Sequence, residues 1–169
     1  MARRFRGEST HKVDAKGRVS IPALFRRVLQ AGDPDWKEGL NPNLVIVYGD
    51  HRRKYLECFT MEAIEEVDDQ IATMKRGTRE RKLLEVLFNG QSLPTNVDET
   101  GRLVLPVKLR EKIGLSKEAF FIATGDTFQI WSPETFAAEN ARNEEWLDAQ
   151  PEDFDVLSLL PERADERLQ

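Results

Sequence analysis

The sequence predicts a mixed α+β protein, mainly β, built from two copies of one unit. The stretch VDAKGRVSIPALFR at residues 13–26 returns as VDETGRLVLPVKLR at residues 97–110, with Asp, Gly, Arg and Pro at the same positions. In each copy, short apolar runs interrupted by a Gly-Asp pair follow, which is typical of β-hairpins. Apolar residues at helical spacing occupy the segment between the copies. Because a solenoid usually needs three or more repeats, two copies indicate a pair related by a pseudo-two-fold axis.

Each copy begins with two predicted strands, at residues 6–13 and 18–21 in the first copy, joined by a tight turn. We expect a local hairpin in which Gly17, and Gly101 in the second copy, adopt the positive φ that such a turn needs. Asp14 and Asp98 are placed to accept backbone N–H bonds inside the turns. We therefore assign these four residues a structural role.

The elements after the turns follow from prolines and from apolar spacing. Pro22 and Pro106 predict helix starts, because proline at the first helical position loses no hydrogen bond. Strands are expected next, at 43–50 and 54–59 in the first copy and at 119–126 and 127–131 in the second. Two connector helices are expected, one over 61–76 and one over 78–90. The acidic tail that follows residue 140 is expected to be partly disordered, with a short helix near 154–160.

These elements predict four parts: a first repeat at 8–59, a helical connector at 60–91, a second repeat at 92–135 and an acidic C-terminal extension at 136–169. The first copy is longer than the second through GDPDWKEGLNPN at 32–43 and HRRK at 51–54, which we interpret as loop extensions.

The charge is unevenly distributed along the chain. The formal net charge is −5, yet residues 1–30 carry eight Arg or Lys against two acids, and residues 134–169 carry eleven acids against three Arg. A basic start on an acidic protein points to an anionic partner, and nucleic acid is the first candidate. The sequence contains no apolar run long enough for a membrane span, so no membrane partner is expected. A single cysteine, Cys58, excludes an intrachain disulfide and favours a cytoplasmic setting.

The sequence offers little for catalysis. Its two histidines, His11 and His51, lie in unlike contexts, and neither is near a cluster with metal-ligand spacing or in a recognisable nucleophile motif. No P-loop or dinucleotide fingerprint is present. We expect no catalytic residue, no metal, no cofactor and no small-molecule substrate, so the protein is not predicted to be an enzyme. Cys58 lies in an apolar strand and is predicted to be a buried small hydrophobic residue.

The basic residues around the first turn predict a DNA contact. A β-ribbon can enter the major groove, where arginine binds guanine through two hydrogen bonds, and flanking cations bind phosphates. We expect Arg18 and Lys16 to be the principal contacts and Arg102 a weaker one, because Glu99 and Thr100 occupy the second tip. The alternative is that each turn arginine pairs with a neighbouring carboxylate. The full set of candidate DNA-binding residues is Arg3, Arg4, Arg6, His11, Lys12, Lys16, Arg18 and Arg102.

The stretch FRGESTHKVDAKGRVSIPALFR, together with VDETGRLVLPVKLR, resembles the MraZ family of bacterial transcriptional regulators over residues 3–140. The resemblance implies that each copy is a SpoVT-AbrB-type unit and that both form one AbrB/MraZ-like double-split (swapped-hairpin) β-barrel. It also implies a ring-shaped homo-oligomer in the cytoplasm, associated with the nucleoid. The basic positions of the family's turn fall on Lys16 and Arg18, and on Thr100 and Arg102 in the second copy.

The same resemblance implies a sequence-specific, mostly repressing regulator. It would bind direct repeats of double-stranded DNA in the promoter of the division and cell wall gene cluster, which includes its own gene. A second class of function is a protein-interaction module, such as an antitoxin-like scaffold whose acidic tail meets a basic partner. Two fused copies with no obvious toxin-binding extension argue against that alternative.

Overall fold

The computed structural model describes residues 3–162 of the 169-residue chain. The chain divides into two compact units, Met1–Phe136 and Ala137–Gln169. Both repeats and their connector fall in the first unit, and the expected four-part division stays a prediction. No helix in the part of the chain that the structure describes is long and apolar enough to cross a membrane.

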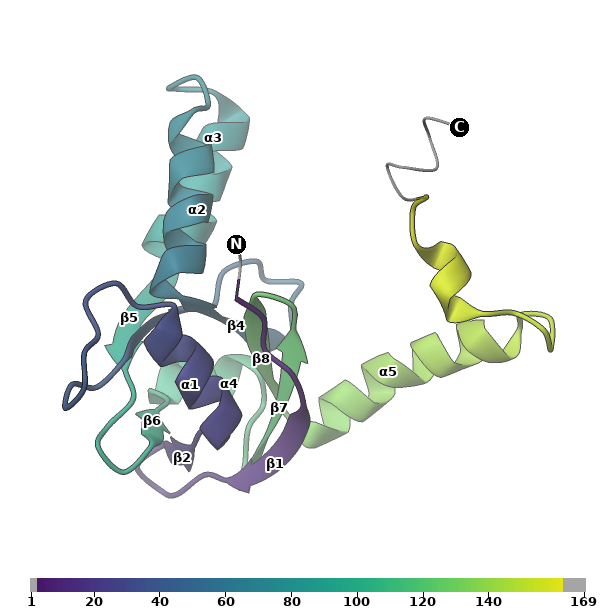
Figure 1. The fold of residues 1–169 in the computed structure, drawn as a ribbon, viewed down its shortest axis with the longest axis horizontal. Helices are drawn as coiled ribbons and strands as arrows, with labels where there is room; N and C mark the ends of the chain where they lie inside the picture. Colours follow the sequence, from purple (N-terminus) through teal and green to yellow (C-terminus); the bar gives the residue numbers. More distant parts are fainter. Residues whose placement is uncertain (1–2, 163–169) are drawn as a thin grey trace. The chain divides into compact units, whose positions relative to one another are not determined.

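Each repeat contains the same order of elements: two strands, a helix and two more strands (Figure 1). In the first repeat these are β1 (Glu8–Lys12), β2 (Arg18–Ser20), α1 (Ala23–Ala31), β3 (Asn43–Val47) and β4 (Tyr55–Thr60). In the second repeat they are β5 (Ser92–Asn96), β6 (Arg102–Val104), α4 (Val107–Lys112), β7 (Glu118–Thr124) and β8 (Thr127–Trp131). The connector forms α2 (Met61–Ala72), α3 (Arg79–Glu85) and a π-helical turn, η1 (Val86–Gly90). The chain continues with α5 (Pro133–Asp148) and a 3₁₀ turn, η2 (Val156–Leu159).

Strands of the two repeats pair with one another rather than within each repeat alone. The main sheet is antiparallel, with the order β1-β7-β8-β4-β3-β5, and β2 and β6 form a second, two-stranded sheet. The order is the same from either edge, since β1 lies against β7 of the other repeat and β5 lies against β3. The protein is therefore a mixed α+β structure with mainly antiparallel sheet.

Two expectations about strand pairing are wrong. The predicted local hairpin of residues 6–13 and 18–21 reduces to a single bridge between Val13 and Val19, because β1 and β2 separate and pair with β7 and β6. The expected closed barrel is not found within residues 3–162: the six-stranded sheet ends at β1 and β5, and β2–β6 remains a separate ladder. Local turn chemistry can set a bend, but it cannot choose a strand's partner.

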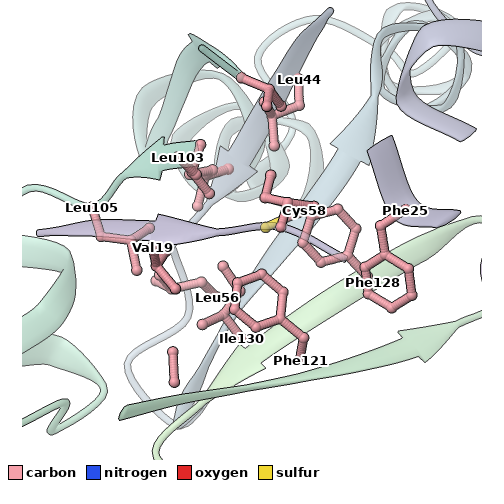
Figure 2. Close-up of a cluster of buried hydrophobic side chains, with 14 of the residues drawn as sticks. Val19, Phe25, Leu44, Leu56, Cys58, Leu103, Leu105, Phe121, Phe128 and Ile130 are labelled. Atoms are coloured by element: carbon pink, nitrogen blue, oxygen red, sulfur yellow. The ribbon is translucent and has the colours of Figure 1, made fainter. Parts of the chain in front are cut away.

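The core lies between the main sheet and the β2–β6 pair. Val19 of β2 and Leu103 of β6 are 1% and 0% exposed, and Figure 2 shows them among buried side chains of the main sheet such as Phe128. Helix α1 contributes Phe25 and Leu29, which lie on one face as their spacing predicts. Cys58 is fully buried in this cluster, as expected, and burial raises the pKa of its thiol. Burial of this apolar surface is the main force that holds the two repeats together.

The connector helices α2 and α3 lie side by side and extend away from the sheet (Figure 1). Thr60 caps α2 by accepting the backbone N–H of Ala63 at 3.0 Å through its side-chain hydroxyl. Ala63 and Ile64 pack with Val45 and Phe59 in a second apolar cluster. No residue of α3 is buried, so much of its surface is open to solvent.

The segment after the second repeat is more ordered than expected. Helix α5 continues past residue 140 to Asp148, where partial disorder was predicted, and the predicted short helix near 154–160 is η2. In the second unit the Trp146 and Phe154 rings meet edge to face, with centroids 5.7 Å apart. Aromatic packing of this kind offsets part of the entropy cost of ordering a polar segment.

The close approach of the two turns to the opposite repeat makes Gly17 a sensitive position. Gly17 has φ +81°, and a Cβ there would overlap the carbonyl oxygen of Leu105. Gly125 has nearly the same angle, φ +82°, with nothing within 4 Å of a Cβ. We expect both Gly→Ala variants to lose about 1–3 kcal/mol through the positive φ. Gly17→Ala should lose more than Gly125→Ala because the backbone must also shift.

Urea unfolding of Gly17→Ala and Gly125→Ala, with wild type as reference, measures this difference. Equal losses of unfolding free energy in the two variants would show that the repeats are not in contact at this turn.

Candidate nucleic-acid interface

The first turn is closed by Asp14. Its Oδ1 accepts the backbone N–H groups of Lys16 and Arg18, each at 2.9 Å, and its carbonyl oxygen accepts the N–H of Gly17 at 2.9 Å. Arg18 Nε donates to Asp14 Oδ2 at 2.7 Å, while 37% of the Arg18 side chain remains exposed. The backbone N–H of Arg18, and then its guanidinium, hold the pKa of Asp14 below its usual value. The guanidinium is thus held in place by its own turn and still reaches solvent.

The second turn has the same backbone and a different tip. Asp98 Oδ1 accepts the N–H groups of Thr100 at 2.9 Å and Arg102 at 2.8 Å. Arg102 Nε donates to Thr100 Oγ1 at 2.8 Å and lies 3.4 Å from Asp98 Oδ2, so the threonine hydroxyl stands partly between the charges. The backbone N–H of Arg102 is the main reason that the pKa of Asp98 is lowered, followed by the Thr100 hydroxyl. The Arg102 side chain is also 37% exposed.

Pairing of β2 with β6 brings the two arginines onto one surface. Val19 pairs with Leu103 and both point into the core, so the neighbouring residues on each strand point outward. Arg18 lies opposite Val104 and Arg102 opposite Ser20, which makes the arginines diagonal neighbours, a separation of about 7–8 Å in an antiparallel pair. We call this surface the ribbon face; it consists of Arg18, Ser20, Arg102 and Val104 with the turn tips Lys16 and Thr100.

A second pair of repeated arginines has a different position. Arg26 of α1 reaches the turn of the other repeat, where its Nη1 lies against Gly101. Arg110 of α4 lies against Gly17, and its Nε donates to the carbonyl oxygen of Leu105 at 2.8 Å. These residues support the turns from behind. Arg26 and Arg110 end the duplicated motif at 13–26 and 97–110, but the sequence pattern predicted no role for them.

Of the other candidates, Lys12 is near the ribbon face and His11 is oriented inward. Lys12 is exposed at the end of β1, two residues before Asp14. His11 shares a hydrogen bond with Ser9 Oγ at 2.8 Å, and its ring meets buried Phe121 edge to face at 5.5 Å. Burial lowers the pKa of His11, which keeps the imidazole neutral near pH 7. The structure thus does not bring His11 to the ribbon face as a cation.

The three N-terminal arginines lie at the other end of β1. The backbone N–H of Phe5 donates to Gly125 O in the turn between β7 and β8, and the Phe5 ring is buried. Lys12 pairs with Glu118 at the opposite end of β7, about 20 Å away at 3.4 Å per residue. Arg4 and Arg6 are exposed, and Arg3 Nε lies 3.9 Å from Glu62. The expected single basic patch is therefore two separate basic surfaces.

No group of three or more His, Cys, Asp or Glu side chains within residues 3–162 is placed to hold a metal ion. A hollow of about 720 Å³ lies between the 50–54 loop, η1 and α4, apart from both turns. The surface that the repeated residues build is thus a polar, partly cationic ribbon on a rigid base.

Comparison with known proteins shows the family. The family model described as "MraZ protein, putative antitoxin-like" matches residues 88–156. A protein of Ruegeria pomeroyi named transcriptional regulator MraZ is 70% identical over 161 residues, which cover 95% of this chain and 96% of that protein. This chain belongs to the MraZ family of transcriptional regulators.

More distant members of the MraZ family are similar over most of the chain as well. The transcriptional regulator MraZ of Cereibacter sphaeroides is 47% identical over 169 residues, covering 96% of this chain and 98% of that protein. That of Parvibaculum lavamentivorans is 37% identical over 134 residues, covering 79% of each. The resemblance predicted from the doubled turn motif is confirmed.

The hydrogen-bonded carboxylates of the two turns predict a specific dependence of stability on pH. Because the pKa values of Asp14 and Asp98 are lowered on folding, their ionisation stabilises the fold above the ordinary value of 3.8. This contribution is lost as pH falls through 3.8 towards the lower folded-state values. Asp14→Asn with Asp98→Asn keeps the Oδ1 acceptors and removes the charges.

We expect wild type to be more stable than this double variant at neutral pH, and the gap to close in acid. Urea unfolding across that pH range measures the gap. A gap that stayed constant below pH 3.8 would mean that the carboxylate charges do not stabilise the turns.

Proposed function

We propose that this MraZ-family protein regulates transcription by binding double-stranded DNA in a sequence-specific manner with the ribbon face. The observation that carries the proposal is the outward, diagonal placement of Arg18 and Arg102 on two paired strands. A two-stranded ribbon fits the width of the major groove, and arginine forms two hydrogen bonds to the O6 and N7 acceptors of guanine. Each guanidinium uses Nε within its own turn, which leaves the Nη end for a base edge.

The remaining cations would set affinity and orientation. Lys16 at the first tip and Lys12 at the end of β1 are proposed to contact phosphates beside the groove. The first turn combines Lys16 with Arg18, whereas the second has Glu99 and Thr100 beside Arg102, so the first turn would bind more strongly. Arg3, Arg4 and Arg6, at the far end of β1, would contact a different stretch of the DNA backbone. His11 is the least supported of the proposed contacts.

The finer features that the family resemblance implies are part of this proposal. They are a swapped-hairpin relation of the two repeats, assembly into a ring-shaped homo-oligomer, association with the nucleoid, and repression through direct repeats in the promoter of the division and cell wall gene cluster. The strand pairing between repeats supports the first of these. A ring would help binding because identical ribbon faces held at fixed spacing raise the effective concentration of each later contact.

Arg18→Ala tests the proposed base contact. Loss of one bidentate contact to guanine is expected to cost about 1–3 kcal/mol, so the affinity for a promoter fragment from upstream of the gene should fall about tenfold or more. A gel shift or fluorescence anisotropy titration at fixed salt concentration measures this loss, and thermal unfolding establishes that the variant is folded.

Two control variants separate DNA contact from turn structure. Asp14→Asn retains the Oδ1 acceptor and frees Arg18 from its ion pair, so its affinity for DNA should equal or exceed that of wild type. Arg76→Ala removes an exposed arginine in the turn between α2 and α3 and should change nothing. Unchanged binding by Arg18→Ala, or capture of one stoichiometric protein partner in place of DNA, would contradict the proposal.

Thr100→Lys tests whether the second turn is weaker because of its tip. The change places a lysine where the first turn has Lys16 and removes the hydroxyl between Arg102 and Asp98. We expect tighter DNA binding and a slope of log affinity against log salt that steepens by about 0.9 if one phosphate contact is added. Thr100→Ala, which removes the hydroxyl without adding charge, should leave the slope unchanged. Identical slopes for the Lys and Ala variants would place the second tip away from DNA.

A further inference from the structure

An apolar strip on the connector is exposed within the first unit. Leu83 of α3 and Val86 at the start of η1 are three residues apart on one helical face, and they are 55% and 52% exposed. Leu87 beside them is half-buried. Large aliphatic side chains grouped in this way are costly to leave in water, which marks the strip as a candidate interaction surface.

The strip forms one wall of the 720 Å³ hollow, and basic side chains form most of the rest. The 50–54 loop, which carries the HRRK extension of the first repeat, and helix α4 line the other sides. Arg79 and Lys82 flank the strip on its far side. Among the described residues that line the hollow, Asp50 is the only acidic one, and it pairs with Arg52 at 2.8 Å. We call this surface the basic groove; its lining cations are Arg52, Arg53, Lys54, Lys108 and Lys112.

The two repeats differ in the residues that line the basic groove. Lys108 and Lys112 of α4 stand where α1 has Leu24 and Val28, each 84 residues earlier. Lys112 Nζ donates to the backbone carbonyl oxygens of Tyr48, Gly49 and Asp50, which orders the loop that holds the HRRK extension. Lys108 Nζ lies 5.2 Å from the centre of the Tyr48 ring.

The segment before the first repeat differs from its counterpart before the second. Phe5 packs edge to face on Phe25 and Phe128 in the buried core. The counterpart of Phe5, 84 residues later, is Asn89, which instead donates to Asp68 Oδ1 at 3.1 Å. The segment before the first repeat thus adds an aromatic ring to the core, whereas the matching position before the second repeat is polar and exposed.

The second unit carries a segment of complementary chemistry. Around η2 the aliphatic side chains of Val156, Leu157, Leu159 and Leu160 are between 51% and 65% exposed. Four acids surround them: Glu152, Asp153, Asp155 and Glu162. We call residues 152–162 the acidic leucine segment. The segment presents exposed leucines among carboxylates, and the groove presents exposed aliphatic residues among cations. The two surfaces are therefore opposite in charge, and both carry exposed apolar side chains.

We propose that the acidic leucine segment of one copy of this protein docks in the basic groove of a second copy. Docking would remove both sets of exposed aliphatic side chains from water and place the carboxylates beside the groove cations. DNA fits the groove less well, because a phosphate backbone would neutralise the cations and leave Leu83 and Val86 exposed. The contact is independent of the ribbon face and does not rest on DNA binding.

Zero-length carbodiimide cross-linking of the full-length protein tests the contact. Equal amounts of ¹⁴N-labelled and ¹⁵N-labelled protein are mixed, allowed to exchange and cross-linked, and the linked peptides are identified by mass spectrometry. We expect amide links from Lys108 or Lys82 to Asp153 or Asp155, about half of them joining one light and one heavy peptide. Links of a single isotope only, or no links at these positions, would overturn docking between copies.

Paired variants identify the two surfaces. One double variant changes the segment, Leu157→Asp with Leu160→Asp, and the other changes the groove, Leu83→Asp with Val86→Asp. Each should lower the yield of mixed links at least about tenfold, which corresponds to a loss of binding free energy of about 1.4 kcal/mol or more. All four side chains are exposed, so the changes should leave the fold intact. Leu40→Asp alters a leucine that is 50% exposed in the 32–43 loop and should leave the yield unchanged.

Two results would overturn the proposal at this stage. One is an unchanged yield of mixed links in the groove variant. The other is a groove variant that loses affinity for promoter DNA and keeps its links, which would make the groove a nucleic-acid surface. A charge exchange gives an independent check: Lys108→Glu should weaken the contact, and adding Asp155→Lys should restore it.

Discussion

The pairing of β2 with β6 is the contact on which the rest of the structure depends. It joins three residue pairs, and two flanking hydrogen bonds extend it, from Ile21 N to Gly101 O at 2.9 Å and from Leu105 N to Gly17 O at 2.8 Å. Within residues 3–162 each of these strands has its ladder in the other repeat. Neither repeat can therefore bury Val19 or Leu103 alone, so the two copies must fold as one body.

This constraint explains why the repeated arginines occupy two kinds of position. Arg26 and Arg110 reach across to the glycine turns of the opposite repeat, whereas Arg18 and Arg102 project from the ribbon face. Both pairs are identical in sequence between the copies, and only their orientation separates the arginines that support the turns from those proposed to contact DNA. The aspartates add rigidity, because they hold the backbone and the outward arginine of each turn together.

The two repeats share a backbone and differ where they meet solvent. At the turn tips the first copy has lysine and the second has glutamate and threonine. The two ends of the ribbon face therefore differ in charge although their backbones are alike. Away from the ribbon, Lys108 and Lys112 make the groove beside α4 basic, where the matching positions of α1 are Leu24 and Val28. Duplication thus supplied a symmetric framework, and single substitutions produced two separate charged surfaces on it.

Much of this protein follows from the sequence by itself. The doubled Asp-x-x-Gly-Arg turn, the helices after Pro22 and Pro106, the burial of Cys58 and membership of the MraZ family were all predicted, because they depend on turn chemistry, periodicity and motif spacing over a few residues. Tertiary structure alone decided that β1 and β2 separate, that the sheet stays open, and that Arg3, Arg4 and Arg6 lie a strand's length from Arg18. It also decided that Arg26 and Arg110 turn inward and that α5 continues to Asp148. Those outcomes depend on which strand edges and side chains meet across separations of up to about a hundred residues, and no local pattern carries that information.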